Sequence, residues 1–460
     1  MELKRKVYQR LLEWKRRSDG STALLIEGAR RVGKTTVCKR FGSECYRSHV
    51  VIDFAVASPV VKQAFEEKLN DLDAFYQAIS LAYNVRLFRR ETLIIFDEIQ
   101  RFPKAREAIK YLVADGRFDF IETGSLISIK EHVSDIVLPS EEERIRMLPL
   151  DFEEFLWAVG EDILCDYIRA CWQECVQPEG VFHRKAAGLL RECLLVGGMP
   201  QSVVAYLENG KDFYEADIAK RQILALYQGD IKKAARRYRS RVSALFDNIP
   251  GFLSTHEKKV VLSRVSDGGV FSEYDDPLFW LNDSMMCNLC YRCNDPNIGF
   301  ALSKDESSVK CYMGDTGLLV SLAFSESEIT SMNLYRQIME GRLSLNEGML
   351  HENLVAQMLV AKGRKLYFYT HYSEERHRND IKIDFLVSNE SKTNFKVNPI
   401  EVKSSKNYSA ISYGKFKERF GKRVGTSYIV HPKGFIQDED GFRIPTYMFF
   451  CLFEDAEPRS

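Results

Sequence analysis

The sequence has no net charge, because its 65 lysine and arginine residues balance its 65 aspartate and glutamate residues. This balance gives no global argument for binding nucleic acid or a membrane surface, so any basic site has to be local. The chain also lacks an apolar run of membrane-spanning length, and its first residues read as an amphipathic stretch, not as an apolar signal core. We therefore expect a cytoplasmic protein with no membrane partner.

Several catalytic signatures are missing as well. There is no H-E-x-x-H, no G-x-S-x-G and no Cys/His pair with a known local signature. Eleven scattered cysteines are typical of reduced cytosolic thiols, not of a disulfide framework. The spacing of Cys287, Cys290 and Cys293, with Cys311 further on, could ligate zinc or an iron–sulfur cluster. We favour the alternative, a strand in which cysteine is a small apolar residue, because no loop rich in Gly or His surrounds the cluster.

A complete phosphate-binding loop is the strongest feature that is present. Residues 28–35 match G-x-x-x-x-G-K-[ST], between an apolar run at 23–27 that predicts a strand and the start of a predicted helix. Glycines let backbone N–H groups curl around an anion, and the helix dipole adds to the attraction. The alternative is a turn that binds nothing. The residues predicted to bind ATP here are Gly28, Ala29, Arg30, Arg31, Val32, Gly33, Lys34, Thr35 and Thr36.

An acidic pair, Asp97-Glu98, follows the apolar run at 93–96. Parallel α/β sheets place their ligands at the carboxyl ends of the strands. We expect Thr35 and Asp97 to bind Mg²⁺, and Glu98 to polarise the water that attacks the γ-phosphate of ATP. After the next predicted strand, at 118–122, the hydroxyl of Ser125 is predicted to sense the γ-phosphate, although a serine there is commonly just a helix cap.

These elements resemble the AAA+ branch of P-loop ATPases. Residues 144–155 look like the basic strand, Pro-Leu and Phe-x-Glu-Phe signature of a group of bacterial and archaeal ATPases, and residues 196–200 look like its lid signature. Many members carry a C-terminal domain of unknown function. The resemblance also implies a homo-oligomer with a trans-acting arginine, for which Arg144 and Arg146 are the candidates.

The pattern along the chain divides it into four parts. Strands and helices alternate up to residue 150, as in a parallel sheet covered by helices, and residues 151–212 are helical. Helices predicted at 216–228, 242–246 and 257–265, followed by paired strands, suggest a winged-helix module. A basic cluster at 232–241 would follow a DNA backbone if it lay on one helix face, or would be only a solvated face. We expect an AAA+ core at 1–150, a lid at 151–212, a winged-helix-like module at 213–330 and an α/β domain at 335–460.

The last part of the chain holds a second constellation. Asp384 lies in one predicted strand, Glu401 and Lys403 share a face of another, and Glu352 lies in a predicted helix. Two acids from adjacent strands can bind Mg²⁺, and a lysine beside them can position the attacking water. The arrangement resembles the PD-(D/E)XK nuclease superfamily, although no proline precedes Asp384 and a charged edge strand is the plain alternative. The resemblance implies Glu352, Asp384 and Glu401 as metal ligands, and Asp384, Glu401 and Lys403 as catalytic residues.

The predicted fold class is therefore α/β: a P-loop NTPase core of the AAA+/ASCE type with a helical lid, a winged-helix module and a PD-(D/E)XK nuclease-like domain. Three function classes remain open. The first is an ATPase whose nucleotide state controls a nuclease that binds DNA through the winged-helix and C-terminal domains. The second is a regulatory or defence ATPase with an inactive C-terminal binding domain. The third is a motor or loader whose C-terminal fold only binds DNA.

Overall fold

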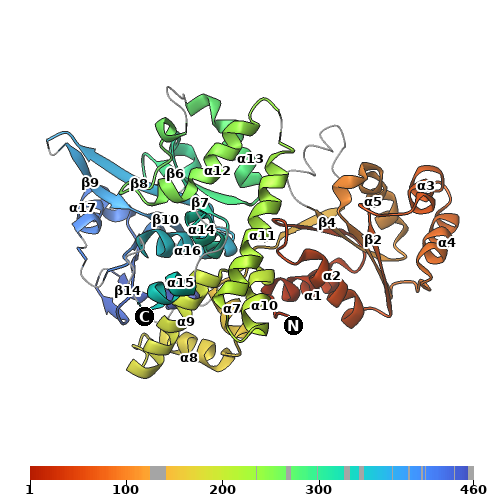
Figure 1. Cartoon of the computed structure of the whole chain (residues 1–460), viewed down its shortest axis with the longest axis horizontal. Coiled ribbons are helices and arrows are strands. Elements are labelled where there is room, and N and C mark those ends of the chain that lie inside the picture. The colour runs from red at the N-terminus through yellow and green to blue at the C-terminus, as the bar shows by residue number, and fades with distance from the viewer. Residues whose placement is uncertain are drawn as a thin grey trace. The chain divides into compact units, whose positions relative to one another are not determined.

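The computed structural model describes residues 1–124, 141–234, 236–265, 271–297, 299–325, 332–340, 347–375, 377–391, 394–405, 408–409, 411–439 and 441–453. The chain forms two compact units (Figure 1). One unit comprises Lys4–Leu148 with Asp283–Met285. The other comprises Met1–Leu3, Pro149–Asn282 and Met286–Ser460. Among the described residues, no helix has both the length and the apolar character needed to cross a membrane.

The first unit contains a five-stranded sheet in the order β2-β3-β4-β1-β5. Every neighbouring pair in it is parallel. Strands β1, β3 and β4 are buried along their whole length, as expected for parallel strands covered on both faces. The strands are β1 (Ala23–Glu27), β2 (Ser48–Asp53), β3 (Thr92–Asp97), β4 (Asp119–Gly124) and β5 (Glu142–Arg146).

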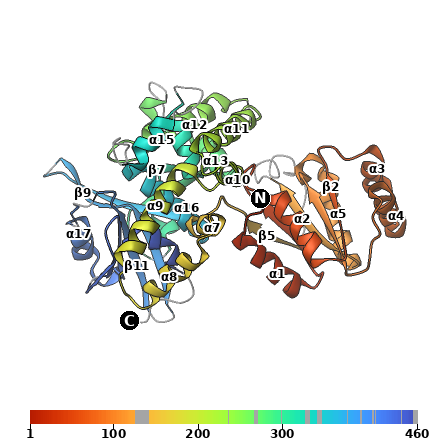
Figure 2. The same cartoon turned by 60° about the horizontal axis from the view of Figure 1, so that its bottom comes forward.

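Helices lie on both sides of this sheet (Figure 2). One face packs on α3, α4 and α5 through an apolar cluster that includes Ile52, Phe65, Phe96 and Ile109. Because side chains alternate along a strand, Leu24 and Ile26 point to the other face, on the side of α2. The helices are α1 (Lys6–Ser18), α2 (Lys34–Cys45), α3 (Pro59–Glu67), α4 (Leu72–Tyr83) and α5 (Pro103–Asp115), with a short 3₁₀ turn, η1 (Ile99–Arg101).

The second unit begins with helices. An Asp151–Glu154 capping box starts α7, in which each side chain accepts a hydrogen bond from the other residue's backbone N–H. The helices of this unit are α7 (Phe152–Ala158), α8 (Asp162–Gln173), α9 (Gly180–Val196), α10 (Pro200–Glu208), α11 (Phe213–Ile231), α12 (Arg239–Leu253), α13 (Asp275–Asp283), α14 (Thr316–Ala323), α15 (Met332–Met339), α16 (Glu347–Ala361) and α17 (Ile411–Phe420).

Two sheets complete this unit, in the orders β7-β6-β8-β9 and β10-β11-β12-β14-β13. The antiparallel hairpin β6–β7, which the sequence assigns to a wing, pairs in parallel with β8 at Cys290 and Leu366, so it shares a sheet with strands of the C-terminal part. The strands are β6 (Cys287–Cys293), β7 (Lys304–Met313), β8 (Leu366–Ser373), β9 (Arg378–Ile383), β10 (Phe385–Ser391), β11 (Asn394–Val402), β12 (Ser427–His431), β13 (Ile436–Asp438) and β14 (Gly441–Pro445).

Helices α16 and α17 contact these strands from different sides. Helix α17 packs on them through an apolar cluster that includes Ile383, Val397, Tyr413 and Phe416. Helix α16, which contacts β6, β7, β8 and β11, contributes no residue to that cluster. Polar side chains on the α16 side of the strands can therefore meet those of α16.

Two local expectations differ from the structure. The predicted helix at 257–265 is absent. Its only helical turn is 3₁₀, at Leu262–Arg264, and Val260 N donates a hydrogen bond to Val309 O in an extended arrangement. The basic cluster does not share a helix, because α11 ends at Ile231 and α12 begins at Arg239. The i, i+4 basic face that would follow a DNA backbone is therefore not formed.

Candidate nucleotide site and C-terminal carboxylate site

The loop between β1 and α2 has the backbone shape that its glycines predict. Gly33 has a φ of 93°, and a Cβ at position 28 would lie 2.4 Å from the carbonyl oxygen of Met147. Glycine is therefore needed at both positions. Arg5 supports the loop, because its Nη1 donates a hydrogen bond to the carbonyl oxygen of Val32 at 3.0 Å.

Lys34 lies within this loop. Its Nζ donates hydrogen bonds to the carbonyl oxygens of Gly28 at 2.9 Å and Ala29 at 3.1 Å. Burial lowers the pKa of Lys34, and the negative charges of Glu98 and Asp97 offset only part of that effect. The ammonium is thus held against the loop backbone, and both acids of the predicted pair lie near enough to act on it.

The carboxyl ends of three strands bring together the predicted magnesium ligands. Thr35 Oγ1 donates a hydrogen bond to Asp97 Oδ2 at 2.9 Å, and the hydroxyl of Thr123, at the end of β4, donates to Asp97 Oδ1. Strand β4 lies between β1 and β3, which places Thr123 next to both. Ser125, the predicted γ-phosphate sensor, lies outside the described residues. The described hydroxyl at the end of β4, that of Thr123, bonds to Asp97.

Glu98 is held in an unusual conformation directly after β3. It has a φ of 53°, and Gln100 Nε2 donates a hydrogen bond to its Oε2 at 2.6 Å. Left-handed backbone at a non-glycine residue costs free energy and is found preferentially at functional sites. The remaining predicted loop residues divide by exposure: Ala29 and Val32 are buried and offer only their backbone, whereas Arg30, Arg31 and Thr36 are exposed.

This donor set fits a Mg²⁺-bound nucleotide. It combines a glycine loop at a helix start, a buried lysine, and a hydroxyl paired with a carboxylate. The candidate trans-acting arginines lie on the edge strand β5. Of these, Arg144 Nε pairs with Glu142 Oε1 at 2.7 Å, and Arg144 Nη1 lies 3.9 Å from Glu27 Oε1.

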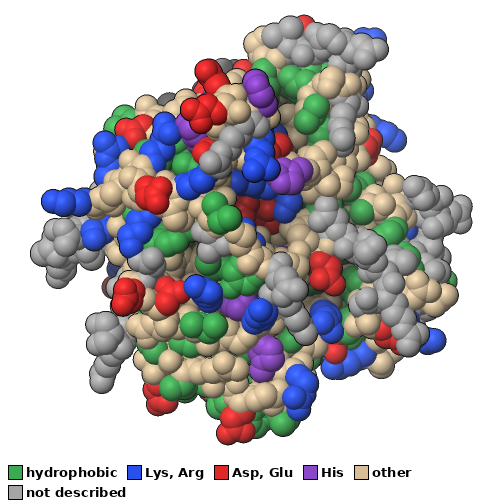
Figure 3. Space-filling model, turned by 90° about the vertical axis from the view of Figure 1, so that its left-hand side faces the viewer, with side chains coloured by type: hydrophobic (Ala, Val, Ile, Leu, Met, Phe, Trp, Pro, Cys, Tyr) green, Lys and Arg blue, Asp and Glu red, His purple; other side chains and the backbone are tan. Residues whose placement is uncertain are grey.

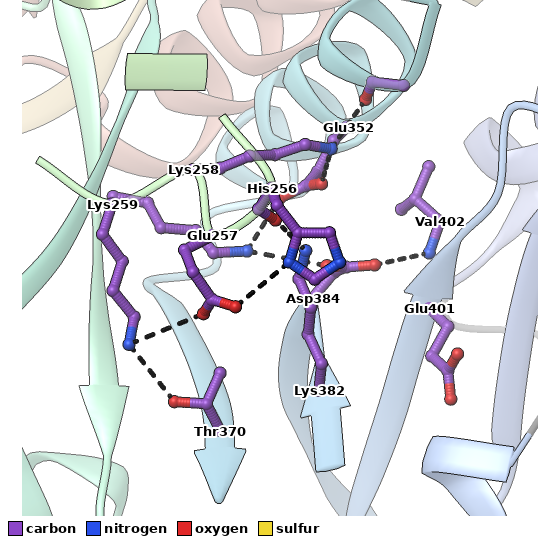
Figure 4. A network of polar contacts seen from close by, with 12 residues as sticks. His256, Glu257, Lys258, Lys259, Glu352, Thr370, Lys382, Asp384, Glu401 and Val402 are labelled. Atoms are coloured by element: carbon purple, nitrogen blue, oxygen red, sulfur yellow. Dashed lines mark hydrogen bonds and ion pairs between the residues drawn. The ribbon is translucent and has the colours of Figure 1, made fainter. Parts of the chain in front are cut away.

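In the second unit, Glu352 on α16 is surrounded by cations. Its Oε1 accepts hydrogen bonds from Lys310 Nζ at 2.8 Å and from the hydroxyl of Tyr312, and its Oε2 pairs with Lys258 (Figure 4). Burial alone would raise the pKa of Glu352, but the lysines, with Lys382 as a third, outweigh burial and lower it. Both carboxylate oxygens are therefore already bound by the chain itself.

Asp384 lies between β9 and β10, beside this cluster. Its Oδ2 accepts a hydrogen bond from the backbone N–H of Val402 at 2.9 Å. Its Oδ1 lies 3.6 Å from Lys310 Nζ and makes no hydrogen bond with any described residue. Lys310 thus bridges Glu352 and Asp384, and one buried oxygen of Asp384 retains capacity for a further ligand.

Glu401 and Lys403 form a pair of their own, with Lys403 Nζ 2.6 Å from Glu401 Oε2. Burial raises the pKa of Glu401, and the attraction of Lys403 offsets that effect only in part. Because side chains alternate along a strand, Glu401 lies on the same face of β11 as Val397, which belongs to the apolar cluster under α17. Figure 4 shows the Glu401 carboxylate pointing away from that of Asp384.

The predicted metal ligands therefore lie in one region without forming a three-carboxylate site. No group of three or more His, Cys, Asp or Glu side chains in the described part of the chain is arranged to hold a metal ion. This finding covers the cysteines of β6 and β7 as well, all of which are buried free thiols. Asp384 fits a metal through Oδ1, which makes no hydrogen bond with a described residue, whereas Glu352 does so only if it releases a lysine.

Sequence reasoning missed four residues of this network: Lys258, Lys310, Tyr312 and Lys382. A signal was present for Lys310, which is a single lysine inside the apolar stretch 309–313 of β7 and is fully buried. A buried lysine requires a carboxylate partner. Lys258 carried no such signal, because it lies in a segment that the periodicity assigned to a helix.

The face shown in Figure 3 has a hollow in which acidic side chains lie deep, with basic and histidine side chains around it. A cavity of about 520 Å³ in this unit is lined by residues that include His256, Glu257, Arg378, Asn379 and Lys415. Its lining also includes Asp380, which pairs with Lys415 at 3.1 Å.

Three family models match the chain. Residues 20–156 match an AAA domain, residues 187–329 a domain of unknown function (DUF8612), and residues 347–449 another domain of unknown function (DUF4143). The AAA match and the parallel sheet together support an ATP-binding P-loop NTPase core of the AAA+ type. No curated protein matches the chain in sequence.

Solved structures with some likeness include the Aeropyrum pernix ORC1 protein in complex with DNA, which is 12% identical, with 71% of this chain and 93% of that chain covered and a TM-score of 0.28. The closed state of Hsp104 with ATPγS and casein is 12% identical, with coverage of 65% and 58% and a TM-score of 0.28. Drosophila ORC bound to DNA is 13% identical, with coverage of 68% and 93% and a TM-score of 0.26.

Proposed function

We propose that this protein hydrolyses ATP with Mg²⁺ at the site formed by Lys34, Thr35, Asp97 and Glu98. The convergence of Thr35 in the first turn of α2, Thr123 at the end of β4 and Asp97 at the end of β3 carries this proposal. Mg²⁺ held by Thr35 and Asp97 would neutralise charge on the β- and γ-phosphates. Lys34 binds the same phosphates, and Glu98 orients the attacking water and accepts its proton.

Phosphate release from ATP by the purified full chain tests this function, with the Glu98→Gln variant as the comparison. Turnover that depends on Mg²⁺ and falls in the variant supports the proposal. Equal rates for the two proteins would mean that another group activates water or that a contaminating enzyme causes the turnover.

We further propose that the nucleotide state controls a C-terminal domain of the PD-(D/E)XK type that binds DNA. Supporting observations are the placement of Glu352 on α16, Asp384 between β9 and β10, and Glu401 with Lys403 on and after β11. In this proposal Asp384 and Glu401 hold Mg²⁺, Glu352 is an outer ligand, and Lys403 positions the water that attacks a phosphodiester. Glu401 would have to turn toward Asp384 for this arrangement.

A second candidate is a C-terminal domain that binds DNA without cleaving it. One observation favours it: both oxygens of Glu352 are bonded to Lys258, Lys310 and Tyr312. Plasmid cleavage by the full chain with Mg²⁺ or Mn²⁺, with and without ATP, separates the two candidates. Cleavage supports the nuclease, and binding of the plasmid without any cleavage supports the binding domain.

The ATPase is also proposed to act as a homo-oligomer in which an arginine from one subunit completes the site of the next. Arg144 and Arg146 are the candidates, because both are exposed on the edge strand β5. Mixing an Arg144→Ala protein with a Lys34→Ala protein should restore part of the ATPase activity. A monomeric mass with full activity would contradict shared sites.

A further inference from the structure

A loop from outside the matched C-terminal region reaches the carboxylate cluster. The Lys258 loop, residues 255–260, follows α12, and Lys258 itself has a φ of 55°. Its side chain is only 12% exposed. Its Nζ donates a hydrogen bond to the carbonyl oxygen of Gly348 at 3.0 Å and pairs with Glu352 Oε2 (Figure 4). Lys258 thus adopts a left-handed backbone conformation in an irregular segment, and its ammonium group is directed at the carboxylate of Glu352.

Further contacts hold the loop over this site from both ends. Lys382 Nζ donates to the carbonyl oxygen of His256 at 2.7 Å, and Asn379 Nδ2 donates to Glu257 Oε2 at 2.7 Å. Beyond Lys258, the backbone N–H of Val260 donates to Val309 O at 2.9 Å. Each partner belongs to β9 or β7, the strands on either side of the cluster. These are polar contacts between exposed or partly buried groups, which can exchange for water more readily than an apolar core can open.

Glu352 pairs directly with two ammonium groups, those of Lys258 and Lys310. Lys310, on β7, is fully buried and bridges Glu352 and Asp384, so it is a fixed part of the site. Lys258, on a loop, is the second cation. A divalent ion bound to Glu352 would need the oxygen that Lys258 occupies and would be repelled by its charge.

We propose that Lys258 is a tethered cation that sets the affinity of the C-terminal site for divalent metal, so that metal enters as Lys258 withdraws. This inference rests on the proposed function, in which Asp384 and Glu401 hold the metal ion and Glu352 is an outer ligand. It makes the Lys258 loop a determinant of activity that lies outside residues 347–449, the part of the chain matched by the C-terminal family model. It also explains why lysine side chains of the chain itself occupy the carboxylate of Glu352.

Mn²⁺ binding to the nucleotide-free full chain, followed by electron paramagnetic resonance of the free ion, tests the proposal. Lys258→Met keeps the length of the side chain and removes its charge. The expected result is tighter binding by about tenfold or more, because a nearby positive charge is removed from a poorly solvated site. The matched control is Lys259→Met, since Lys259 Nζ contacts Thr370 Oγ1 instead of Glu352. An unchanged or weaker affinity in folded Lys258→Met would overturn the proposal.

The Asp384→Asn substitution distinguishes an error in the role of Lys258 from an error in the proposed metal site. If it removes the added affinity from the Lys258→Met protein, the metal lies at the C-terminal site and Lys258 governs its entry. If Asp384→Asn weakens Mn²⁺ binding in the wild-type background while Lys258→Met changes nothing, only the role of Lys258 is wrong. If Asp384→Asn alters binding in neither background, the proposed metal site fails and the inference fails with it.

Hydrogen exchange gives a second readout that does not depend on how well Lys258→Met folds. Mn²⁺ added to the wild-type chain should speed exchange of the Val260 amide, because withdrawal of Lys258 loosens its bond to Val309 O. Lys258→Arg, which keeps the charge, should behave like wild type. Saturation with Mn²⁺ without any change in exchange at residues 255–260 would overturn the proposal.

Discussion

Thr35 and Asp97 are 62 residues apart in the chain, and the threonine hydroxyl donates a hydrogen bond to the aspartate carboxylate at 2.9 Å. The contact exists because β1 and β3 run in parallel with β4 between them, so that the segments after each strand meet at one edge. A hydroxyl and a carboxylate in this position are the groups through which P-loop ATPases hold Mg²⁺, so the contact supports the proposed site.

Lys34→Ala and Asp97→Asn should each weaken Mg-ATP binding by about 10- to 100-fold, because each removes a charge-assisted interaction with the bound nucleotide and its ion. Isothermal titration calorimetry measures the change. Asp53→Asn is the matched control, since Asp53 ends the neighbouring strand β2 in register with Asp97. Equal losses for Asp53 and Asp97 would place the site elsewhere on this edge of the sheet.

Glu98→Gln should keep ATP affinity within about threefold of wild type while turnover falls by about 100-fold or more, since general-base catalysis contributes at least that much. The amide keeps the shape of the side chain and cannot accept a proton. Binding and phosphate release, measured on the same preparation, give both quantities. A variant that hydrolyses ATP at the wild-type rate would show that Glu98 is not the base.

Thr123→Val should lower the ATPase rate at limiting Mg²⁺, because Asp97 loses a hydrogen bond that orients its carboxylate. We expect a several-fold rise in the Mg²⁺ concentration at half-maximal rate, as is typical of the groups that orient metal ligands. Thr123→Ser keeps the hydroxyl and should restore the wild-type value. The same defect in both variants would point to lost packing as the cause.

How much of this could be predicted from the sequence depends on the range of the interactions. Lys34 and Asp97 were identifiable because a loop motif and an apolar run followed by an acid are local patterns. Lys310 and Lys258 reach Glu352 across 42 and 94 residues, so no local spacing reveals Glu352 as their shared partner. The predicted helix at 257–265 failed for the same reason, since a long-range backbone hydrogen bond from Val260 to Val309 outweighs helical periodicity.

Glu122 should make the stability of the N-terminal unit depend on pH. Burial, with the negative charge of Glu142 adding to it, raises the pKa of Glu122 from its ordinary 4.5 to about 8. The folded state therefore holds a proton that the unfolded state has released, and this stabilisation is full below about pH 4.5 and is lost as the pH rises to about 8.

The side chain introduced by Glu122→Gln cannot ionise, so this variant should not lose stability as the pH rises. Thermal unfolding at about pH 5 and about pH 9 should show the midpoint of wild type falling relative to the variant, by several degrees. The exposed Glu91, which pairs with Arg47, serves as the control through Glu91→Gln. Parallel pH profiles for wild type and Glu122→Gln would mean that Glu122 ionises normally inside the sheet.

Asp384→Ala and Lys403→Ala should each end DNA cleavage, where wild type shows it, and should leave ATP hydrolysis within about twofold, because neither residue belongs to the nucleotide site. Asp384 offers the carboxylate oxygen that makes no hydrogen bond with a described residue, and Lys403 is paired with Glu401 at 2.6 Å. Loss of Asp384 removes metal affinity, whereas loss of Lys403 removes the group beside the attacking water. DNA binding should persist in both, since the basic side chains around the cavity are unchanged.

Supercoiled plasmid with Mn²⁺ measures cleavage, and a gel shift in EDTA measures binding without metal. Lys396→Ala serves as the control, because Lys396 lies on the same strand, β11, as Glu401 but toward its other end. Cleavage that survives Asp384→Ala would assign the activity to another site or to a contaminant. If wild type binds plasmid and cuts none with any divalent metal, the domain acts on DNA by binding alone.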